Sequence, residues 1–229
     1  TGADDVFNLT EDDIIKNNLE KELLIPLTRG GDVDRYRTTP SMYLLYPYQE
    51  SKKGETTLID EKTLERNFPN AFKYLKSHEK SLRGRKDSRK TLKNAEDWYK
   101  LIRYGKYSLF NSIKLLTPGE SITNSFALDK LATAYSFARV YSIVPKTVNK
   151  LFLLSVLNSR LLEYALHAIC PLKRGGYYTY SSTYLVNAPI RRIDFTTPSK
   201  ERKRLASQII DVYGDGDRAE VLQQLQEAM

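Results

Sequence analysis

The stretch KRGGYYTY at residues 173–180 gathers two cations, two glycines and three tyrosines at one place in the chain. Cationic side chains neutralise phosphates, and glycines let the main chain approach a ligand closely with unhindered N–H groups. Tyrosines add hydroxyl donors and apolar faces that suit a sugar or a base. This chemistry predicts contact with a polyanion. The residues predicted to make that contact are Lys173, Arg174, Gly175, Gly176, Tyr177 and Tyr178.

A structural alternative exists for the same stretch. The glycines can form a turn before a strand whose tyrosines alternate between core and surface, with Tyr178 and Tyr180 on one face and Tyr177 on the other. The two interpretations are compatible, because a strand can bury one face and present the other to a ligand.

A second group of cations lies between Lys76 and Lys106. This segment has eleven Lys or Arg and four Asp or Glu, a balance of +7 within a chain whose net charge is +8. A local field of this kind attracts polyanions, although a solvated loop kept soluble by its charges is the alternative. An arginine fork can bind both acceptors of guanine, and aromatic rings are interleaved with these cations. The predicted contact residues are Arg83, Arg85, Lys86, Arg89, Lys90, Trp98 and Arg103.

Catalytic and metal-binding patterns are absent from the sequence. The chain has two histidines, His78 and His167, and one cysteine, Cys170, and none of them stands in a cluster with ligand spacing. The tripeptides at 50–52 and 201–203 have the Glu-x-Lys form of metal-dependent nucleases but lack a suitable acidic partner upstream. We therefore predict no catalytic residue, no metal and no cofactor in this chain, and His167 is expected to be a core or interfacial histidine.

Bulk properties fit a globular chain of 229 residues with one main domain. The lone cysteine excludes an internal disulfide and suits a reducing cytoplasm, and no apolar run is long enough for a membrane span. The first residues, TGADDVF, begin abruptly, so we expect a fragment of a longer protein.

Elements in the first half are predicted from periodicity and turn signals. Thr10 and Asp13 form a capping-box pattern that starts a helix, which Pro26 and the glycines at 30–31 end. We expect a strand over 42–48, a turn over 52–57 and a helix over 68–82. The basic segment that follows has no clean period and is expected to be a long surface excursion with one helical turn near Trp98.

In the second half, β-like runs at 112–117, 120–129 and 133–145 predict antiparallel strands. Residues 146–170 predict a buried helix, and 182–190 a strand stopped by Pro189. Two further helices are expected at 199–213 and 217–229. The fold class is therefore α+β, with mixed, largely antiparallel sheets, flanking helices and a C-terminal helical appendage. We expect a domain over 1–190 and a helical extension over 191–229.

Seven stretches in sequence order resemble the TaqI-like C-terminal specificity domain. They are TGADDVF, ELLIPLTRGGDVDRY, YLLYPY, FPNAFKYLKSHEKSLRGR, WYKLIR, LLSVLNSRLLEYAL and KRGGYYTYSSTYLVNAPI. This family is the target-recognition part of N6-adenine DNA methyltransferases and of type IIG restriction–modification enzymes, which serve bacterial defence.

The resemblance implies a non-catalytic domain that reads a short sequence in double-stranded DNA. An adjacent methyltransferase domain of the same polypeptide would bind S-adenosylmethionine and flip the adenine, and Mg²⁺ would be needed if the parent also has a nuclease domain. The family also suggests that residues 98–103 and 174–178 lie near DNA. Two alternatives remain: a structural module that docks another protein of a restriction–modification complex, and a free-standing metal-dependent nuclease.

Overall fold

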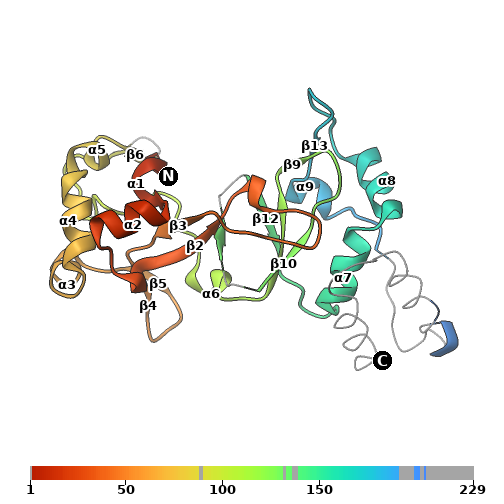
Figure 1. The fold of residues 1–229 in the computed structure, drawn as a ribbon, viewed down its shortest axis with the longest axis horizontal. Helices are drawn as coiled ribbons and strands as arrows, with labels where there is room; N and C mark the ends of the chain where they lie inside the picture. Colours follow the sequence, from red (N-terminus) through yellow and green to blue (C-terminus); the bar gives the residue numbers. More distant parts are fainter. Residues whose placement is uncertain are drawn as a thin grey trace. The chain divides into compact units, whose positions relative to one another are not determined.

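The structure, a computed structural model, describes residues 2–87, 90–130, 133–135, 139–190, 199–201 and 204. The chain forms two compact units, and each unit is assembled from separate stretches of sequence (Figure 1). Unit 1 comprises Thr1–Thr28, Pro40–Ser112 and Lys130–Phe137. Unit 2 comprises Arg29–Thr39, Ile113–Asp129 and Ala138–Met229. The domain boundary at residue 190 stays a prediction.

Unit 1 begins with α1 (Asp4–Phe7) and α2 (Glu11–Asn17). The predicted capping box is confirmed, since the Thr10 hydroxyl accepts from the Asp13 N–H at 3.2 Å and the Asp13 carboxylate accepts from the Thr10 N–H at 3.0 Å. The helix ends earlier than predicted, because Asn18 adopts a left-handed conformation with φ of 49°. A short turn, η1 (Lys21–Leu23), follows, and Pro26 lies inside a strand and does not end a helix.

The main sheet of unit 1 has the order β1–β3–β2–β11. Its strands are β1 (Asn8–Leu9), β2 (Leu24–Thr28), β3 (Met42–Leu45) and β11 (Ala134–Tyr135). Only β11 runs parallel to its neighbour, β2. The predicted strand over 42–48 is divided, because β3 ends at Leu45 and Tyr48 starts a separate hairpin. That hairpin joins β4 (Tyr48–Glu50) to β5 (Thr56–Leu58) through the predicted turn.

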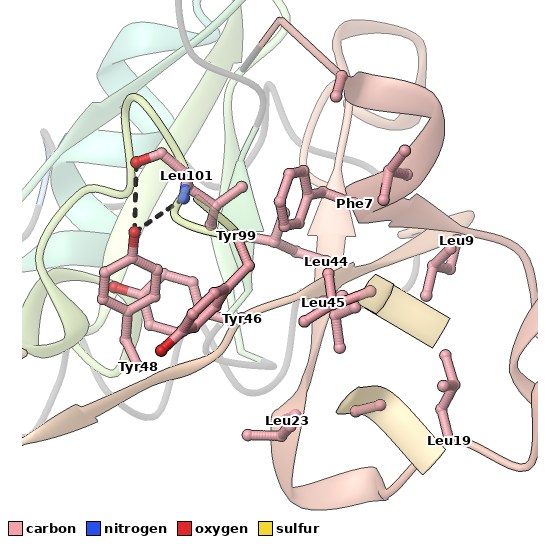
Figure 2. Close-up of a cluster of buried hydrophobic side chains, with 14 of the residues drawn as sticks. Phe7, Leu9, Leu19, Leu23, Leu44, Leu45, Tyr46, Tyr48, Tyr99 and Leu101 are labelled. Atoms are coloured by element: carbon pink, nitrogen blue, oxygen red, sulfur yellow. Dashed lines mark hydrogen bonds between the residues drawn. The ribbon is translucent and has the colours of Figure 1, made fainter. Parts of the chain in front are cut away.

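Three helices cover the core of unit 1: α3 (Glu61–Asn67), α4 (Pro69–Ser77) and α5 (Glu79–Arg83). The helices α4 and α5 confirm the predicted helix over 68–82, which is interrupted at His78, whereas α3 was not predicted. Figure 2 shows the apolar side chains that fill this core. At its edge, the Tyr48 hydroxyl donates to the Leu101 carbonyl at 3.2 Å and accepts from the Leu101 N–H at 2.8 Å.

The basic segment differs from the prediction at its centre. Its ends include the small hairpin of β6 (Lys86–Asp87) and β7 (Lys90–Thr91) and the short α6 (Tyr107–Phe110). Between them, Trp98, Tyr99 and Leu101 are almost completely buried in the core of unit 1. Large rings release much apolar surface from water when buried, which explains why this stretch is not a surface excursion throughout.

Unit 2 contains an antiparallel sheet of order β10–β8–β12 and a second pair, β9 with β13. Their bounds are β8 (Lys114–Pro118), β9 (Glu120–Ser121), β10 (Ala127–Asp129), β12 (Val140–Ile143) and β13 (Tyr178–Thr179). The predicted antiparallel strands of this region are thus largely confirmed, although they are shorter than predicted and the one expected over 133–145 is divided between β11 and β12.

Helices of unit 2 pack beside these strands. The predicted helix over 146–170 is two helices, α7 (Lys150–Leu157) and α8 (Arg160–Ile169), which meet at Asn158 and Ser159. The predicted strand over 182–190 is wrong, because Ser182–Leu185 form a helical turn, α9. Tyr184 and Leu185 of this turn pack against the core of unit 2, which favours the helical conformation locally.

The described residues confirm an α+β fold with small, largely antiparallel sheets and flanking helices. The helices predicted over 199–213 and 217–229 lie outside the described residues, apart from a few helical positions between 199 and 204. Within the described part of the chain, no helix combines the length and apolarity needed to cross a bilayer.

Candidate nucleic-acid interface

The glycine- and tyrosine-rich stretch forms an exposed hairpin on unit 2, residues 171–180. Lys173 N–H donates to the Tyr177 carbonyl at 2.7 Å, and Gly176 N–H donates to the Lys173 carbonyl at 3.3 Å. Residues 171–177 are all exposed. Gly175 and Gly176 both have φ of 82°, a left-handed conformation that other residues adopt only with strain. The glycines therefore shape the tip of this hairpin.

The stem of the hairpin is anchored through aromatic rings. Tyr178 stacks on His167 of α8 with ring centroids 3.8 Å apart and ring planes 4° from parallel. The same histidine lies 3.2 Å from the Tyr180 hydroxyl through Nε2, and that hydroxyl donates to Asn124 at 2.8 Å. Tyr180 is buried, whereas Tyr177 is 43% exposed. The alternation of the tyrosines agrees with the prediction, and half-buried His167 is a positioning residue for the hairpin.

A buried polar network of Asn124 and Asn158 supports the aromatic anchor formed by His167, Tyr178 and Tyr180. The Asn158 amide donates to the Phe126 carbonyl at 2.8 Å and accepts from the Phe126 N–H at 3.0 Å, as a neighbouring strand would do. Asn124 donates from its amide to the Leu157 carbonyl at 2.6 Å. Neither asparagine was predicted as an individual site residue. For Asn158 the signal was the Leu-Asn-Ser step within LLSVLNSRLLEYAL, one of the seven family-like stretches, whereas Asn124 lies outside all of them.

An ion pair fixes a further segment to α8. Arg35 donates to Glu163 at 2.8 Å and to the Asn124 carbonyl at 3.2 Å, and Glu163 also accepts from the Asn124 N–H at 2.8 Å. The backbone of the loop before Phe126 is thereby fixed by Arg35 at the Asn124 carbonyl and by Glu163 at the Asn124 N–H. These partly exposed contacts add to the buried hydrogen bonds of Asn124 and Asn158, and hydrogen-bonded networks of this kind favour a single arrangement of the backbone.

The cations of the hairpin differ in their surroundings. Lys173 forms an ion pair with Glu120 of β9, and both side chains are about half exposed. Exposed pairs of this type contribute about 0–1 kcal/mol, so a phosphate can compete for the lysine. Arg174 is exposed at the tip. Of the predicted residues in unit 2, Arg174, Gly175, Gly176 and Tyr177 are the best placed to meet a ligand.

Two predicted contact residues of unit 1 are in the wrong place for that role. Trp98 is fully buried and Arg85 is only 6% exposed. Arg85 donates to the carbonyls of Trp98 at 2.7 Å and Leu82 at 3.0 Å, and its guanidinium lies 5.4 Å from the Phe7 ring centroid. Burial lowers the pKa of this arginine. Both side chains stabilise the interior of unit 1, so the predicted contact with DNA does not fit them.

Arg83 is also engaged within unit 1. It donates to Glu79 at 2.7 Å and to the carbonyls of Lys93 and Ala95 at 3.2 and 3.0 Å. Its guanidinium carbon lies 5.3 Å from the centroid of the Trp98 ring. These contacts hold the arginine against the core and leave few donors for another ligand.

The remaining predicted residues of unit 1 divide into two groups. Lys86 and Arg103 are exposed and remain candidates for contact. Arg89 lies outside the described residues, and so does the side chain of Lys90. Lys86 and Arg103 belong to unit 1, whereas the hairpin belongs to unit 2, so the structure groups the candidates as two separate sets.

Chemical groups for metal binding do not cluster in the described part of the chain. No set of three His, Cys, Asp or Glu side chains there is arranged to hold a metal ion. Cys170 is buried at the end of α8, and burial raises the pKa of its thiol. A thiol with a raised pKa is a poor nucleophile at neutral pH.

Comparison with known protein families bears directly on the hairpin and its surroundings. Residues 25–190 match the family of the TaqI-like C-terminal specificity domain. The chain belongs to this family. A search of curated proteins found no match. The TaqI-like match includes the exposed hairpin, the Asn158 network and the basic segment of unit 1. Membership supports a specificity role, the recognition of DNA, in methyltransferase-type proteins.

Proposed function

We propose that this chain is the target-recognition domain of a larger adenine-specific DNA methyltransferase or type IIG restriction–modification enzyme. In this role it would hold a short sequence of double-stranded DNA in position for a catalytic domain elsewhere in the same polypeptide. S-adenosylmethionine would bind in that other domain, and this chain would contribute no catalytic residue. The cytoplasm is the expected location, because that is where the DNA of a bacterial cell lies.

One observation carries the proposal: an exposed cationic tip stands on a rigidly supported stem within the family-matched region. Arg174 and two glycines in left-handed conformation form the tip, while stacking of Tyr178 on His167 fixes the stem. Phosphate contacts require cations and accessible N–H groups, and base contacts require side chains that keep their position relative to the backbone. The hairpin combines both properties.

DNA binding by the purified chain is the direct test. A pool of random duplexes is selected on the chain, and the enriched duplex is then titrated by fluorescence anisotropy at several salt concentrations. The logarithm of affinity should fall linearly with the logarithm of salt concentration. In the variant Lys173→Glu/Arg174→Glu we expect weaker binding and a salt slope that is smaller by about 1 for each phosphate that the variant no longer neutralises.

A control variant separates this contact from the overall charge. Lys62→Glu/Lys73→Glu changes the net charge by the same amount at exposed positions of α3 and α4, neither of which is a predicted contact residue. This control should bind nearly as well as the wild type. Equal losses in both variants, or no enrichment of any sequence, would contradict the proposal.

A second candidate function, docking of another protein, has one observation in its favour. Leu161 and Tyr164 lie three residues apart on α8 and are 81% and 79% exposed. Large apolar side chains in such positions are unusual on a surface that contacts only water. Gel filtration with the separately expressed methyltransferase domain tests this role, and Leu161→Ser/Tyr164→Ser should abolish any co-elution.

A further inference from the structure

The loop between β9 and β10, residues 121–125, lies beside the hairpin on unit 2. β9 pairs antiparallel with β13, with Ser121 opposite Tyr178, and Figure 1 shows the two strands side by side. Because these strands run in opposite directions, the chain leaves β9 at Ile122 at the same end of the pair where Tyr177 enters β13 from the tip of the hairpin. The loop and the tip therefore lie at one end of this strand pair.

Asn124 fixes the end of the loop through its main chain and its side chain together. Its N–H donates to Glu163 at 2.8 Å, and its carbonyl accepts from Arg35 at 3.2 Å. Its side-chain amide donates to the Leu157 carbonyl at 2.6 Å and accepts from the Tyr180 hydroxyl at 2.8 Å. Asn124 is thus tied to α7, to α8 and to the stem of the hairpin.

Hydrogen bonds also fix the start of the loop. β9 is paired with β13 up to Ser121, and the Ser121 hydroxyl lies 3.3 Å from the Ser125 hydroxyl across the loop. Ordering a backbone costs conformational entropy, which the hydrogen bonds at both ends of the loop offset. The residues between these ends, Ile122 and Thr123, are therefore presented on a fixed backbone.

Ile122 is the large apolar side chain of this loop and is 51% exposed. Single apolar side chains are common on surfaces, so exposure alone would not identify a site. Ile122 differs because it stands on a firmly held loop beside the hairpin that carries Lys173 and Arg174. Cations position a protein on the phosphates, and base contacts come from side chains that reach the groove from a fixed backbone. Residues 121–125 carry no charge and suit the second role.

The chemistry of isoleucine selects one kind of base edge. In the major groove, the apolar group that a base presents is the 5-methyl group of thymine. A β-branched side chain is stiff about χ1, so a fixed backbone also fixes the direction of its methyl groups. Contact between Ile122 and a thymine methyl would remove apolar surface of both partners from water.

We propose that the loop of residues 121–125 is a second DNA-reading element and that Ile122 recognises thymine through its 5-methyl group in the major groove. The inference rests on the proposed function, the recognition of duplex DNA by this chain. Lys173 and Arg174 hold the phosphates, and Ile122 selects a base. Asn124 is a positioning residue, because it acts through the backbone of the loop.

The test uses the whole chain and the duplex that selection enriches. Each thymine in turn is replaced by deoxyuridine, which lacks the 5-methyl group but keeps the same base pairing. At one position this replacement should weaken binding by the wild type about threefold to fivefold, as expected when one methyl-sized group no longer leaves water. Fluorescence anisotropy at constant salt measures the affinities.

Variants assign the lost contact to the loop. Ile122→Ala should bind the thymine duplex more weakly than the wild type does, and it should bind the thymine and deoxyuridine duplexes equally well. Ile113→Ala is the matched control, because Ile113 is a 53% exposed isoleucine of unit 2 just before β8. This control should discriminate between the two duplexes as the wild type does. Both positions are exposed, so the variants are expected to fold, which circular dichroism checks.

The outcomes separate this inference from the proposed function. If selection enriches no duplex, the proposed function and the inference are both overturned. If a duplex is enriched but contains no thymine, or deoxyuridine at every thymine leaves the affinity unchanged, the inference alone fails. The same holds if Ile122→Ala loses equal affinity for both duplexes and still discriminates between them, because the methyl contact then belongs to another residue.

Discussion

At the scale of single residues, the buried ion pair between Lys114 and Asp129 makes stability sensitive to single substitutions. The two side chains lie opposite each other on β8 and β10, are 2.5 Å apart and are fully buried. Desolvation lowers the pKa of Lys114, while hydrogen bonding to Asp129 opposes that shift. Each charge is therefore tolerated in the sheet because the other one is present.

Removal of one partner of this ion pair should destabilise the protein much more than removal of both partners. Lys114→Met leaves a buried carboxylate without its cation, and we expect it to lower the free energy of unfolding by about 3–5 kcal/mol. Lys114→Met/Asp129→Leu should recover most of this loss, because an apolar pair carries no desolvation cost. Urea unfolding of the wild type, both single variants and the double variant measures these effects. A double variant no more stable than the single variants would contradict this account.

Buried tyrosines make stability depend on alkaline pH. Burial raises the pKa of Tyr99 to about 12, and its hydroxyl donates to the Ile59 carbonyl at 2.6 Å. Because the folded pKa lies above the unfolded value near 10, this contribution is complete below pH 10 and is lost as the pH rises from 10 to about 12. Urea unfolding of Tyr99→Phe over this range should show a shallower decline than the wild type.

The same variant should be less stable than the wild type at neutral pH, by about 1–3 kcal/mol, because the Ile59 carbonyl loses its donor. Tyr104→Phe is the matched control, since Tyr104 is 41% exposed. At neutral pH it should be nearly as stable as the wild type, because an exposed hydroxyl keeps its contact with water. Identical declines in the wild type and Tyr99→Phe would show that this hydroxyl does not contribute.

At the scale of elements, the anchor of the hairpin should control specificity more than affinity. His167→Ala removes the stack on Tyr178 and the contact with the Tyr180 hydroxyl, but it leaves Lys173 and Arg174 in place. An aromatic pair contributes about 0.5–1.5 kcal/mol beyond burial, so discrimination between the selected and a random duplex should fall roughly threefold to tenfold. The salt slope should not change, because the phosphate-binding cations remain.

The other histidine of the chain provides the control for this prediction. His78 lies between α4 and α5 of unit 1, where its ring contacts the Tyr74 carbonyl at 2.9 Å. The variant His78→Ala should bind the selected and random duplexes as the wild type does. A loss of nonspecific binding in His167→Ala, equal to its loss of specific binding, would argue against a positioning role.

Elements with a strong local signal could be predicted from the sequence. The Thr10 capping box and the helix over 68–82 depend on contacts between residues that are close in sequence, and both are confirmed. The strand predicted over 182–190 was wrong because its β-like composition is overridden by packing of Tyr184 and Leu185 on the core of unit 2. Packing of this kind joins distant parts of the chain, and a local pattern does not contain it.

In the candidate site, too, features set by local sequence could be predicted, and features set by packing between distant segments could not. Alternation along residues 177–180 correctly placed Tyr178 and Tyr180 on one face and Tyr177 on the other, since it follows from strand geometry alone. By contrast, Trp98 and Arg85 were expected at the surface because they stand among many cations. The burial of Arg85 depends on the Phe7 ring and on the carbonyls of Leu82 and Trp98, and Trp98 is fully buried in the core of unit 1, none of which a charge count reveals.

At the scale of the whole molecule, the two units are interleaved along the chain. Unit 1 is completed by the segment Lys130–Phe137, which contributes β11 to the edge of its sheet. The Thr28 and Thr133 hydroxyls, 105 positions apart in sequence, hydrogen-bond at 2.9 Å and are fully buried. Because contacts this distant in sequence form late, we expect the edge of the sheet to close after β1, β2 and β3 have paired.

A double-mutant cycle tests this closure. Thr133→Val keeps the shape of the side chain but removes a partner of the buried Thr28 hydroxyl, and it should destabilise the protein by about 1–3 kcal/mol. Thr28→Val/Thr133→Val should cost less than the sum of the single variants, since neither hydroxyl of the pair is then left behind. If the contact forms late in folding, Thr133→Val should accelerate unfolding and leave the folding rate nearly unchanged in stopped-flow measurements. A slower folding rate in Thr133→Val would show instead that β11 joins the sheet before the rate-limiting step.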